Sequence, residues 1–551
     1  MADVIFKRSC HAAVIAWLLF AGAIGPALAA HLRPSTSPAG ADLFAGDWVP
    51  RLEIEVDKEG LSVLRANSSN RYNAPNRPAA LATIREGTNT YRQVAIHLKG
   101  SAGSFRELND KPGFTLHFNS HIPSQRFHGL EKISLNNSVQ DATYMCEVLG
   151  RQVFNATSVP VPWAGHAVVM LNGEPLGLYV LLEGWNKQFL KRHFADTTGN
   201  LYEGAFRDDI TAALEAKSGT EPKNRSDLDA LIAAAREPDL ERRFTAMERV
   251  LDVERFATFV ALEVMLNHWD GYSLHVNNYR IFSDKNSGKL IFMPHGMDQL
   301  FGVRRRQFDA QVLPAPSGLA ARAFMETRAG RRLYLDRMLQ LQTNTFDVAA
   351  LTETVNKLTG LLRPALQSDP GALAEFNATV PVLRQRVAER HAEIAEQLAG
   401  MKTPQFDASG QASLAALDFR RPAREVFDRR RGRFGQEFGR QDTGQTSVPL
   451  RAVVLLEGGQ YRFQARVRTR LDDRVLDTTG VRLRSSEGDS LRREGAGKDW
   501  TVLDHDFTLK ERAYVDLIYQ LGSADDVDAF DKSSLKLTRS TNPSSLPRKP
   551  Q

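Results

Sequence analysis

The chain has 551 residues, of which 42% are hydrophobic, and this length is enough for two or three domains with separate cores. The excess of six positive charges is small for a protein of this size and is interpreted as ordinary surface charge. With only two cysteines, Cys10 and Cys146, a fold held together by several disulfides is excluded, so stability must come from packing.

Residues 1–30 predict a secretory signal peptide. A basic pair precedes the apolar stretch 12–23, and small residues follow it. Cleavage is expected after Ala29 or Ala30, which would export the mature chain to a periplasm, a cell surface or the exterior. An uncleaved membrane anchor is the alternative, but the apolar run is short for a span of about 20 residues. Later segments are less apolar, so no transmembrane span is expected in the mature chain.

The segment from Asp47 to about Phe206 has the pattern of β-strands. Residues 52–56 alternate between apolar and polar side chains, as strands with one buried face do, and similar runs follow at 94–98, 114–118 and 167–171. The pair Asn172-Gly173 is typical of a tight turn, so residues 178–182 are expected to return as the second strand of a hairpin.

Helices are expected next, followed by a hairpin. The spacing of Ser226 and Asp229 suits a capping box, and a helix opened by Asp252 presents one apolar face. This second helix ends near Asn267, which places Asp270 in a helix-to-strand loop. Residues 279–282 and 289–293 are rich in β-branched and aromatic side chains and are joined by a turn sequence ending in Gly288.

The hairpin is expected to bring polar side chains together at one end. Asp270 and Asn277 or Asn278 precede its first strand, and Asp298 follows its second. In a magnesium–nucleotide site, one Asp handles the acceptor hydroxyl while an Asn and a second Asp hold the metal against the phosphates. The sequence therefore predicts such a site at this end of the hairpin.

The remainder of the chain divides into three parts. Helical spacing continues after Asp298 to about Met401, residues 402–447 have the composition of a linker, and residues 448–540 contain short alternating runs typical of a β-sandwich. The basic run 429–433 lies in the linker and is interpreted as solvated charge, with no nucleic-acid partner expected. The predicted fold class is α+β, with an all-β module at the C-terminal end.

An ordered series of motifs resembles the CotH kinase family over residues 47–401. The motifs are 96–100, 111–114, 135–137, 172–179, Glu183, 270–279 and 297–298. The resemblance implies an atypical protein-kinase-like fold that transfers phosphate from ATP to Ser or Thr of other proteins. The C-terminal part resembles jelly-roll modules that bind carbohydrate, with Trp500, Phe507 and Phe530-Asp531 in similar places, which implies a glycan partner.

The resemblance also implies roles for individual residues. Asp270 matches the proposed catalytic Asp and Asp298 the metal-binding Asp, with Asn277 or Asn278 as a further ligand for Mg²⁺ or Mn²⁺. The implied ATP-binding residues are Lys99, Gly100, Gly103 and Arg106 of a glycine-containing loop, Lys111 for the phosphates, and Glu183 to position Lys111. The family commonly has Asp-x-Asp where this chain has Gly296-Met297-Asp298.

Other classes of function remain open at this point. The chain is alternatively a non-catalytic envelope scaffold whose C-terminal sandwich binds glycan. Histidines near the predicted site would suit zinc or another transition metal, although no His-x-x-x-His or Cys-x-x-Cys spacing supports this; they are His97, His117, His268, His275 and His295. A Ser-His-Asp hydrolase is disfavoured because no Gly-x-Ser-x-Gly elbow is evident.

Overall fold

The computed structural model describes residues 38–66, 77–101, 103–303, 310–401, 403–417, 419, 448–467, 482–485, 488–489, 500–521 and 530–540. The predicted signal peptide lies outside the described residues, as does most of the predicted linker, including its basic run. Within the part of the chain that the structure describes, no helix combines the length and apolar character needed to cross a membrane. Helices and several separate sheets are both present, which confirms the α+β class.

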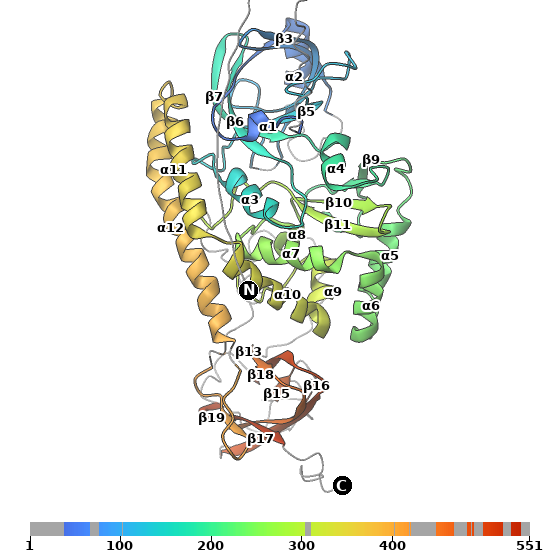
Figure 1. The fold of residues 1–551 in the computed structure, drawn as a ribbon, viewed down its shortest axis with the longest axis vertical. Coiled ribbons are helices and arrows are strands. Elements are labelled where there is room, and N and C mark those ends of the chain that lie inside the picture. Colours follow the sequence, from blue (N-terminus) through green and yellow to red (C-terminus); the bar gives the residue numbers. More distant parts are fainter. Residues whose placement is uncertain are drawn as a thin grey trace, which may run out of the picture. The chain divides into compact units, whose positions relative to one another are not determined.

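The first sheet is a closed barrel in the order β1-β2-β3-β4-β5-β7-β6 (Figure 1). A parallel pairing of β1 with β6 closes it, and the alternation predicted for residues 52–56 buries every second side chain of β1. The predicted hairpin is β6 and β7, whose turn residues Asn172 and Gly173 both have positive φ. The strands are β1 (Arg51–Val56), β2 (Ala80–Glu86), β3 (Asn89–Lys99), β4 (Gly113–His117), β5 (Lys132–Asn136), β6 (Ala164–Leu171) and β7 (Glu174–Glu183).

Four short helices accompany the barrel strands. The first two precede and follow β1, the third lies between β5 and β6, and the fourth follows β7. They are α1 (Ala41–Phe44), α2 (Lys58–Arg65), α3 (Cys146–Asn155) and α4 (Lys187–His193). The most buried of these is α3, whose N-terminus is capped by Asp141: its carboxylate accepts the backbone N–H of Cys146 at 2.9 Å. This capping matters for the site because Glu147 lies in the first turn of α3.

The second sheet has the order β11-β10-β8-β9 and contains the predicted hairpin. Asp284 organises its turn by accepting the backbone N–H groups of Asn286 and Ser287, and Gly288 takes the positive φ that the turn requires. Helix α7 (Val253–Met265) covers this sheet, because its Phe256 packs against Phe292 of β11. The strands are β8 (Leu201–Glu203), β9 (Glu215–Ser218), β10 (Tyr279–Asp284) and β11 (Lys289–Pro294).

Eight helices complete the region up to Gly400. The prediction that Asp252 opens a helix is confirmed, because its carboxylate accepts the N–H of Arg255 at 3.1 Å. The capping box is wrong: α5 begins at Ser226, so Arg225 occupies the capping position and has no side-chain cap. The helices are α5 (Ser226–Ala235), α6 (Leu240–Val250), α7 (Val253–Met265), α8 (Tyr272–His275), α9 (Leu319–Glu326), α10 (Arg328–Asn344), α11 (Val348–Ala365) and α12 (Pro370–Gly400).

The C-terminal part contains two four-stranded sheets that share a core, in the orders β12-β19-β14-β17 and β13-β18-β15-β16. Residues Thr501–Leu509 form one strand, because their pairing with β14 is continuous. One strand, β12, lies inside the predicted linker. The strands are β12 (Gln411–Ser413), β13 (Val448–Leu456), β14 (Gly459–Val467), β15 (Arg482–Ser485), β16 (Gly488–Asp489), β17 (Thr501–Leu509), β18 (Ala513–Leu521) and β19 (Phe530–Ser540).

A histidine links the first helix to the barrel. His128 lies in the connection between β4 and β5, and its Nε2 contacts the Glu86 carboxylate at 2.8 Å while its Nδ1 contacts Asp42 of α1. Hydrogen bonds to Glu86 and then to Asp42 outweigh burial and raise the pKa of His128 above 6.5. The protonated imidazole therefore stabilises the folded state.

We predict a pH-dependent loss of stability that depends on His128. Because folding raises the pKa of His128, its contribution is fully present below the unfolded-state pKa of about 6.5 and disappears as the pH rises through the folded-state pKa. Chemical unfolding at pH 6 and pH 9 should show a larger loss of stability for the wild type than for His128→Gln. The exposed His121→Gln serves as the control, and equal losses in all three proteins would contradict the assignment.

Candidate active site

The loop between α7 and β10 brings together three of the residues predicted for the site. Asn278 donates from Nδ2 to Oδ2 of Asp270 at 3.0 Å and to the carbonyl oxygen of Asp270 at 3.2 Å. Asn277 donates to the same carboxylate oxygen at 3.2 Å. Asn278 has a φ of 49°, a left-handed conformation that Asn tolerates better than most residues. The Asp270 carboxylate is therefore fixed by two amides from the start of the hairpin.

The segment after β11 lies beside this loop. The backbone N–H of His295 donates to the carbonyl oxygen of Asn278 at 2.9 Å, and Nε2 of His268 contacts the carbonyl oxygen of Gly296 at 3.1 Å. Farther along, the N–H of Phe301 donates to the carbonyl oxygen of Leu266 at 2.7 Å. The segment that carries Asp298 is therefore bonded to the segment that carries Asp270. In each segment, these contacts lie both before and after the acidic residue.

Asp298 lies in an acidic environment between the barrel and the helices. Burial raises the pKa of its carboxyl to about 7, with further increases from the negative charges of Glu147, Asp141 and Asp270. Glu147, from the first turn of α3, accepts the N–H of Met297 at 3.1 Å, so this helix is attached directly to the Asp298 segment. The nearby negative charges favour a cation at the Asp298 carboxylate.

Helix α3 packs closely on the same segment. Gly150 is the contact point, because a Cβ atom there would lie 2.5 Å from Leu300 and 3.1 Å from the sulfur of Met297. One turn earlier, Glu147 pairs with Arg151 at 2.8 Å, and both side chains are almost completely buried. The position of α3 therefore sets the position of the Asp298 backbone.

Lys99 is the predicted lysine that faces this acidic group. It ends β3 and donates to the side-chain oxygen of Asn136 at the end of β5. Burial lowers the pKa of Lys99 to about 8; the charges of Glu147 and Asp298 raise it in part, which places both carboxylates within electrostatic range of the ammonium. Sequence analysis assigned Lys99 only to the glycine loop and missed Glu147 altogether.

Lys111 and Glu183 do not form the pair that was predicted. Lys111 precedes β4, donates to the hydroxyl of Tyr144 at 2.9 Å and lies over the ring of Tyr179, and burial lowers its pKa to about 8. Both carboxylate oxygens of Glu183 instead accept from Arg192 of α4. The planar guanidinium matches a carboxylate at two points, which a lysine cannot do. Glu183 therefore holds the corner between β7 and α4.

The loop after β3 folds back on itself. Gly100 and Gly103 have φ values of 113° and 87°, and a Cβ atom on Gly100 would lie 2.9 Å from the backbone of Phe105. Arg106 closes the loop by donating to the carbonyl oxygens of Gly103 and Phe105 at 3.1 Å and 2.8 Å. The predicted glycines therefore allow two parts of the loop backbone to approach each other closely, whereas the guanidinium of Arg106 is hydrogen-bonded within the same loop.

Two cationic side chains near Lys99, those of Lys132 and Arg280, were not predicted from the sequence. Arg280 of β10 is buried, pairs with Glu203 of β8, and lowers the pKa of Lys99 and of Lys132, in each case as a contribution secondary to burial. Its guanidinium lies 5.6 Å from the ring centre of Trp185. We define Lys99, Lys132 and Arg280 as the cationic group; its charges suit phosphate oxygens. Its charge within the otherwise apolar start of β10 could have drawn attention to Arg280, but not to its partners.

The available donors fit a hard divalent cation. Among the described residues no group of three or more His, Cys, Asp and Glu side chains is placed to hold a metal ion, so amide oxygens would have to contribute. The candidate ligands are the carboxylate of Asp298 and an amide oxygen of Asn277 or Asn278, an oxygen set that suits Mg²⁺ or Mn²⁺. Substrate phosphates would complete the coordination. His268 contacts the carbonyl oxygen of Gly296 and does not join this set.

We predict that an acidic residue at position 296 disrupts the site. Gly296 has a φ of 57°, and a Cβ atom there would lie 2.6 Å from Oδ1 of Asn278. Gly296→Asp should displace the Asn278 amide, lower stability by roughly 1–3 kcal/mol and weaken binding of Mg-ATP. Gly288→Asp is the matched control, because Gly288 also has positive φ but faces open space. Thermal unfolding and calorimetric titration measure both effects; tighter nucleotide binding by Gly296→Asp would contradict the prediction.

Comparison with known proteins identifies two relatives at low sequence identity. Inner spore coat protein H of Bacillus subtilis (strain 168) is 24% identical over 267 residues, which cover 44% of this chain and 71% of that protein. Invasin CotH2 of Rhizopus delemar is 24% identical over 276 residues, covering 44% of this chain and 46% of the invasin. The crystal structure of the Helicobacter pylori proinflammatory kinase CtkA aligns with 53% of this chain and 96% of its own at 11% identity; its TM-score of 0.25 is too low to support a shared fold.

A family model extends these pairwise similarities. The model described as CotH kinase protein matches residues 96–396, which include the glycine loop, α3, the Asp270 and Asp298 segments and most of α12. This match spans more than half of the 551 residues, and the chain therefore belongs to the CotH kinase family.

Proposed function

We propose that the protein is an exported, Mg²⁺-dependent protein kinase of CotH type, which transfers the γ-phosphate of ATP to Ser or Thr hydroxyls of envelope or coat proteins. The observation that carries this proposal is the juxtaposition of two acidic segments. Asp270 is held by the amides of Asn277 and Asn278, and the segment bonded beside it carries Asp298. Lys99 lies within electrostatic range of Asp298 from the barrel side.

The two aspartates have different tasks in this proposal. Asp270 accepts a hydrogen bond from the acceptor hydroxyl and orients it toward the γ-phosphorus; a strong base is not required, because phosphoryl transfer depends mainly on positioning and charge neutralisation. Asp298 and one of the Asn side chains hold the cation. The divalent cation, when bound, offsets the charge that builds up on the phosphate oxygens.

The cationic group supplies the remaining phosphate contacts. Lys99, Lys132 and Arg280 approach from β3, β5 and β10, so phosphates bound among them would lie between the barrel and the second sheet. The glycine loop begins directly after Lys99, and its glycines allow the backbone to approach a phosphate closely. The barrel would thus bind the nucleotide, and the hairpin would present the catalytic groups.

The predicted signal segment supports export, and the names of the relatives, a spore coat protein and an invasin, agree with action outside the cytoplasm. A non-catalytic scaffold is the second candidate. It is favoured by Gly296, which stands where the family commonly has an acidic residue and leaves no room for one. Glycan binding by residues 448–540 remains a prediction from the resemblance.

The proposal predicts loss of phosphate transfer when either acidic group is neutralised. With labelled ATP, Mg²⁺ and a generic protein acceptor, Asp270→Asn and Asp298→Asn should each reduce incorporation by about 100-fold or more, because positioning and charge stabilisation supply most of the rate. Asp239→Asn is the control, since Asp239 caps α6 at the surface and Asn caps equally well. Equal label in all variants would favour the scaffold.

Nucleotide binding gives a prediction that does not depend on turnover. Mg-ATP should raise the melting temperature of the wild type, because a ligand that binds only the folded state stabilises it. Lys99→Met should lose most of this increase, whereas Lys357→Met, at an exposed position of α11, should keep it. Differential scanning fluorimetry measures the shifts. An unchanged shift for Lys99→Met would remove Lys99 from the nucleotide site.

A further inference from the structure

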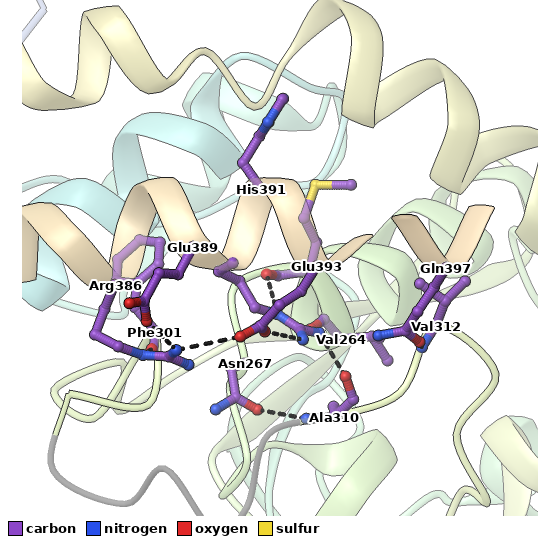
Figure 2. A network of polar contacts seen from close by, with 12 residues as sticks. Val264, Asn267, Phe301, Ala310, Val312, Arg386, Glu389, His391, Glu393 and Gln397 are labelled. Carbon is purple, nitrogen blue, oxygen red and sulfur yellow. Dashed lines mark hydrogen bonds and ion pairs between the residues drawn. The ribbon is translucent and has the colours of Figure 1, made fainter. Parts of the chain in front are cut away.

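Helix α12 places a row of polar residues on one buried face. Arg386 and Arg390 are 3% and 1% exposed, and Glu393 and Gln397 continue the row at helical spacing (Figure 2). A buried charge is costly unless it is paired and hydrogen-bonded. Besides Glu389 and Glu393 of α12 itself, the partners of these two arginines are backbone carbonyls of the segments that lead into and out of the candidate active site.

Arg390 contacts the end of α7, from which the Asp270 loop begins. Its Nη2 donates to the carbonyl oxygens of Val264 and Ala310, both at 2.7 Å, and its Nε donates to that of Met265 at 3.2 Å. The last carbonyls of a helix lack intrahelical donors and carry partial negative charge. One side chain therefore satisfies two of them and ties the end of α7 to Ala310.

Arg386 contacts the segment after Asp298. Its Nε donates to the carbonyl oxygen of Phe301 at 2.9 Å, and the N–H of Phe301 donates in turn to the carbonyl oxygen of Leu266. Phe301 has a φ of 58°, a conformation that a bulky residue adopts only when its surroundings impose it. Arg386 therefore holds a strained backbone unit that joins the two site segments.

Two further hydrogen bonds add to this attachment, one of them from α12. Gln397 accepts the N–H of Val312 at 2.8 Å, and Asn267, at the start of the Asp270 loop, accepts the N–H of Ala310 at 3.0 Å. Figure 2 shows Gln397, Val312, Asn267 and Ala310 along one side of α12, with Glu393 close to Arg386. Glu393 pairs with Arg386 and with Arg390, each at 3.3 Å, which limits the rotamers of both.

We propose that Arg386 and Arg390 are positioning residues for phosphate transfer: from α12 they hold the backbone before Asp270 and after Asp298 in the arrangement that brings the two carboxylates together. This inference rests on the proposed function for its catalytic consequence. Its structural part, the restraint on residues 264–271 and 297–301, stands independently of turnover. The hydrogen bonds described above run from the two arginines to backbone carbonyls, and their ion pairs run to Glu389 and Glu393, which are not proposed to bind ATP or metal.

The test combines hydrogen–deuterium exchange with steady-state kinetics on the full chain. In Arg390→Met, amides of residues 264–271 and 297–301 should exchange about 10-fold faster or more, because their local opening loses its restraint. The kcat for phosphate transfer should fall by about 100-fold, the scale expected for a misplaced catalytic group. KM for ATP should change little, because the cationic group lies elsewhere.

The matched control is Arg384→Met. Arg384 lies on the same helix but donates to Thr359 of α11, so exchange in the site segments and kcat should match the wild type. Equal exchange in Arg390→Met and Arg384→Met would overturn the proposal, as would equal losses of kcat in an active enzyme. If the wild type had no kinase activity, only the proposed function would be overturned. The hydrogen–deuterium exchange data would still test whether the arginines restrain residues 264–271 and 297–301.

Arg390→Lys covers the case in which Arg390→Met does not fold. Lysine keeps the charge and can donate to one carbonyl oxygen, but it cannot reach all three carbonyl oxygens that the guanidinium contacts. Faster exchange confined to 264–271 and 297–301 in this variant would support the proposal. Exchange equal to that of the wild type throughout these residues would contradict it, because a simple buried charge would then suffice.

Discussion

The candidate site depends on the pairing of two segments that are separated in the chain by the β10–β11 hairpin but hydrogen-bonded along their length. One follows α7 and carries Asp270; the other follows β11 and carries Asp298. Hydrogen bonds from His295 to Asn278 and from Phe301 to Leu266 enclose both acidic residues. If this pairing were absent, the carboxylates would be separate turn residues, and neither a metal site nor an oriented hydroxyl acceptor would follow.

Two other helices, α3 and α12, contact this pair of segments. Helix α3 reaches the Asp298 segment through Glu147 and the close contact at Gly150, and it belongs to the barrel side that supplies Lys99. Helix α12 reaches both segments through buried arginines. The segments that carry the acidic residues are therefore in contact with both α3 and α12, so changes in either helix would affect the same carboxylates.

The sequence predicted what local patterns determine. Periodicity and turn chemistry placed the helix after Asp252 and the following hairpin, and the segments that carry Asp270 and Asp298 flank this hairpin and are hydrogen-bonded to each other. Local sequence patterns do not show which side chains contact each other in the folded chain. Glu183 was assigned to a lysine because it ends a strand, yet Arg192 competes for it with better geometry. Glu147 and Arg390 reach the site across about 150 and 125 residues of sequence, and no local signal marks such contacts.

The most direct test of the central claim is the position of a divalent cation in crystals grown with Mn²⁺ and a non-hydrolysable ATP analogue. Anomalous scattering identifies the metal independently of the fold. We predict a Mn²⁺ peak that Asp298 coordinates, beside Asp270 and one of the Asn side chains at the start of the hairpin, with phosphate oxygens completing its shell. Ordered nucleotide elsewhere on the protein, or a metal bound away from both aspartates, would contradict the account.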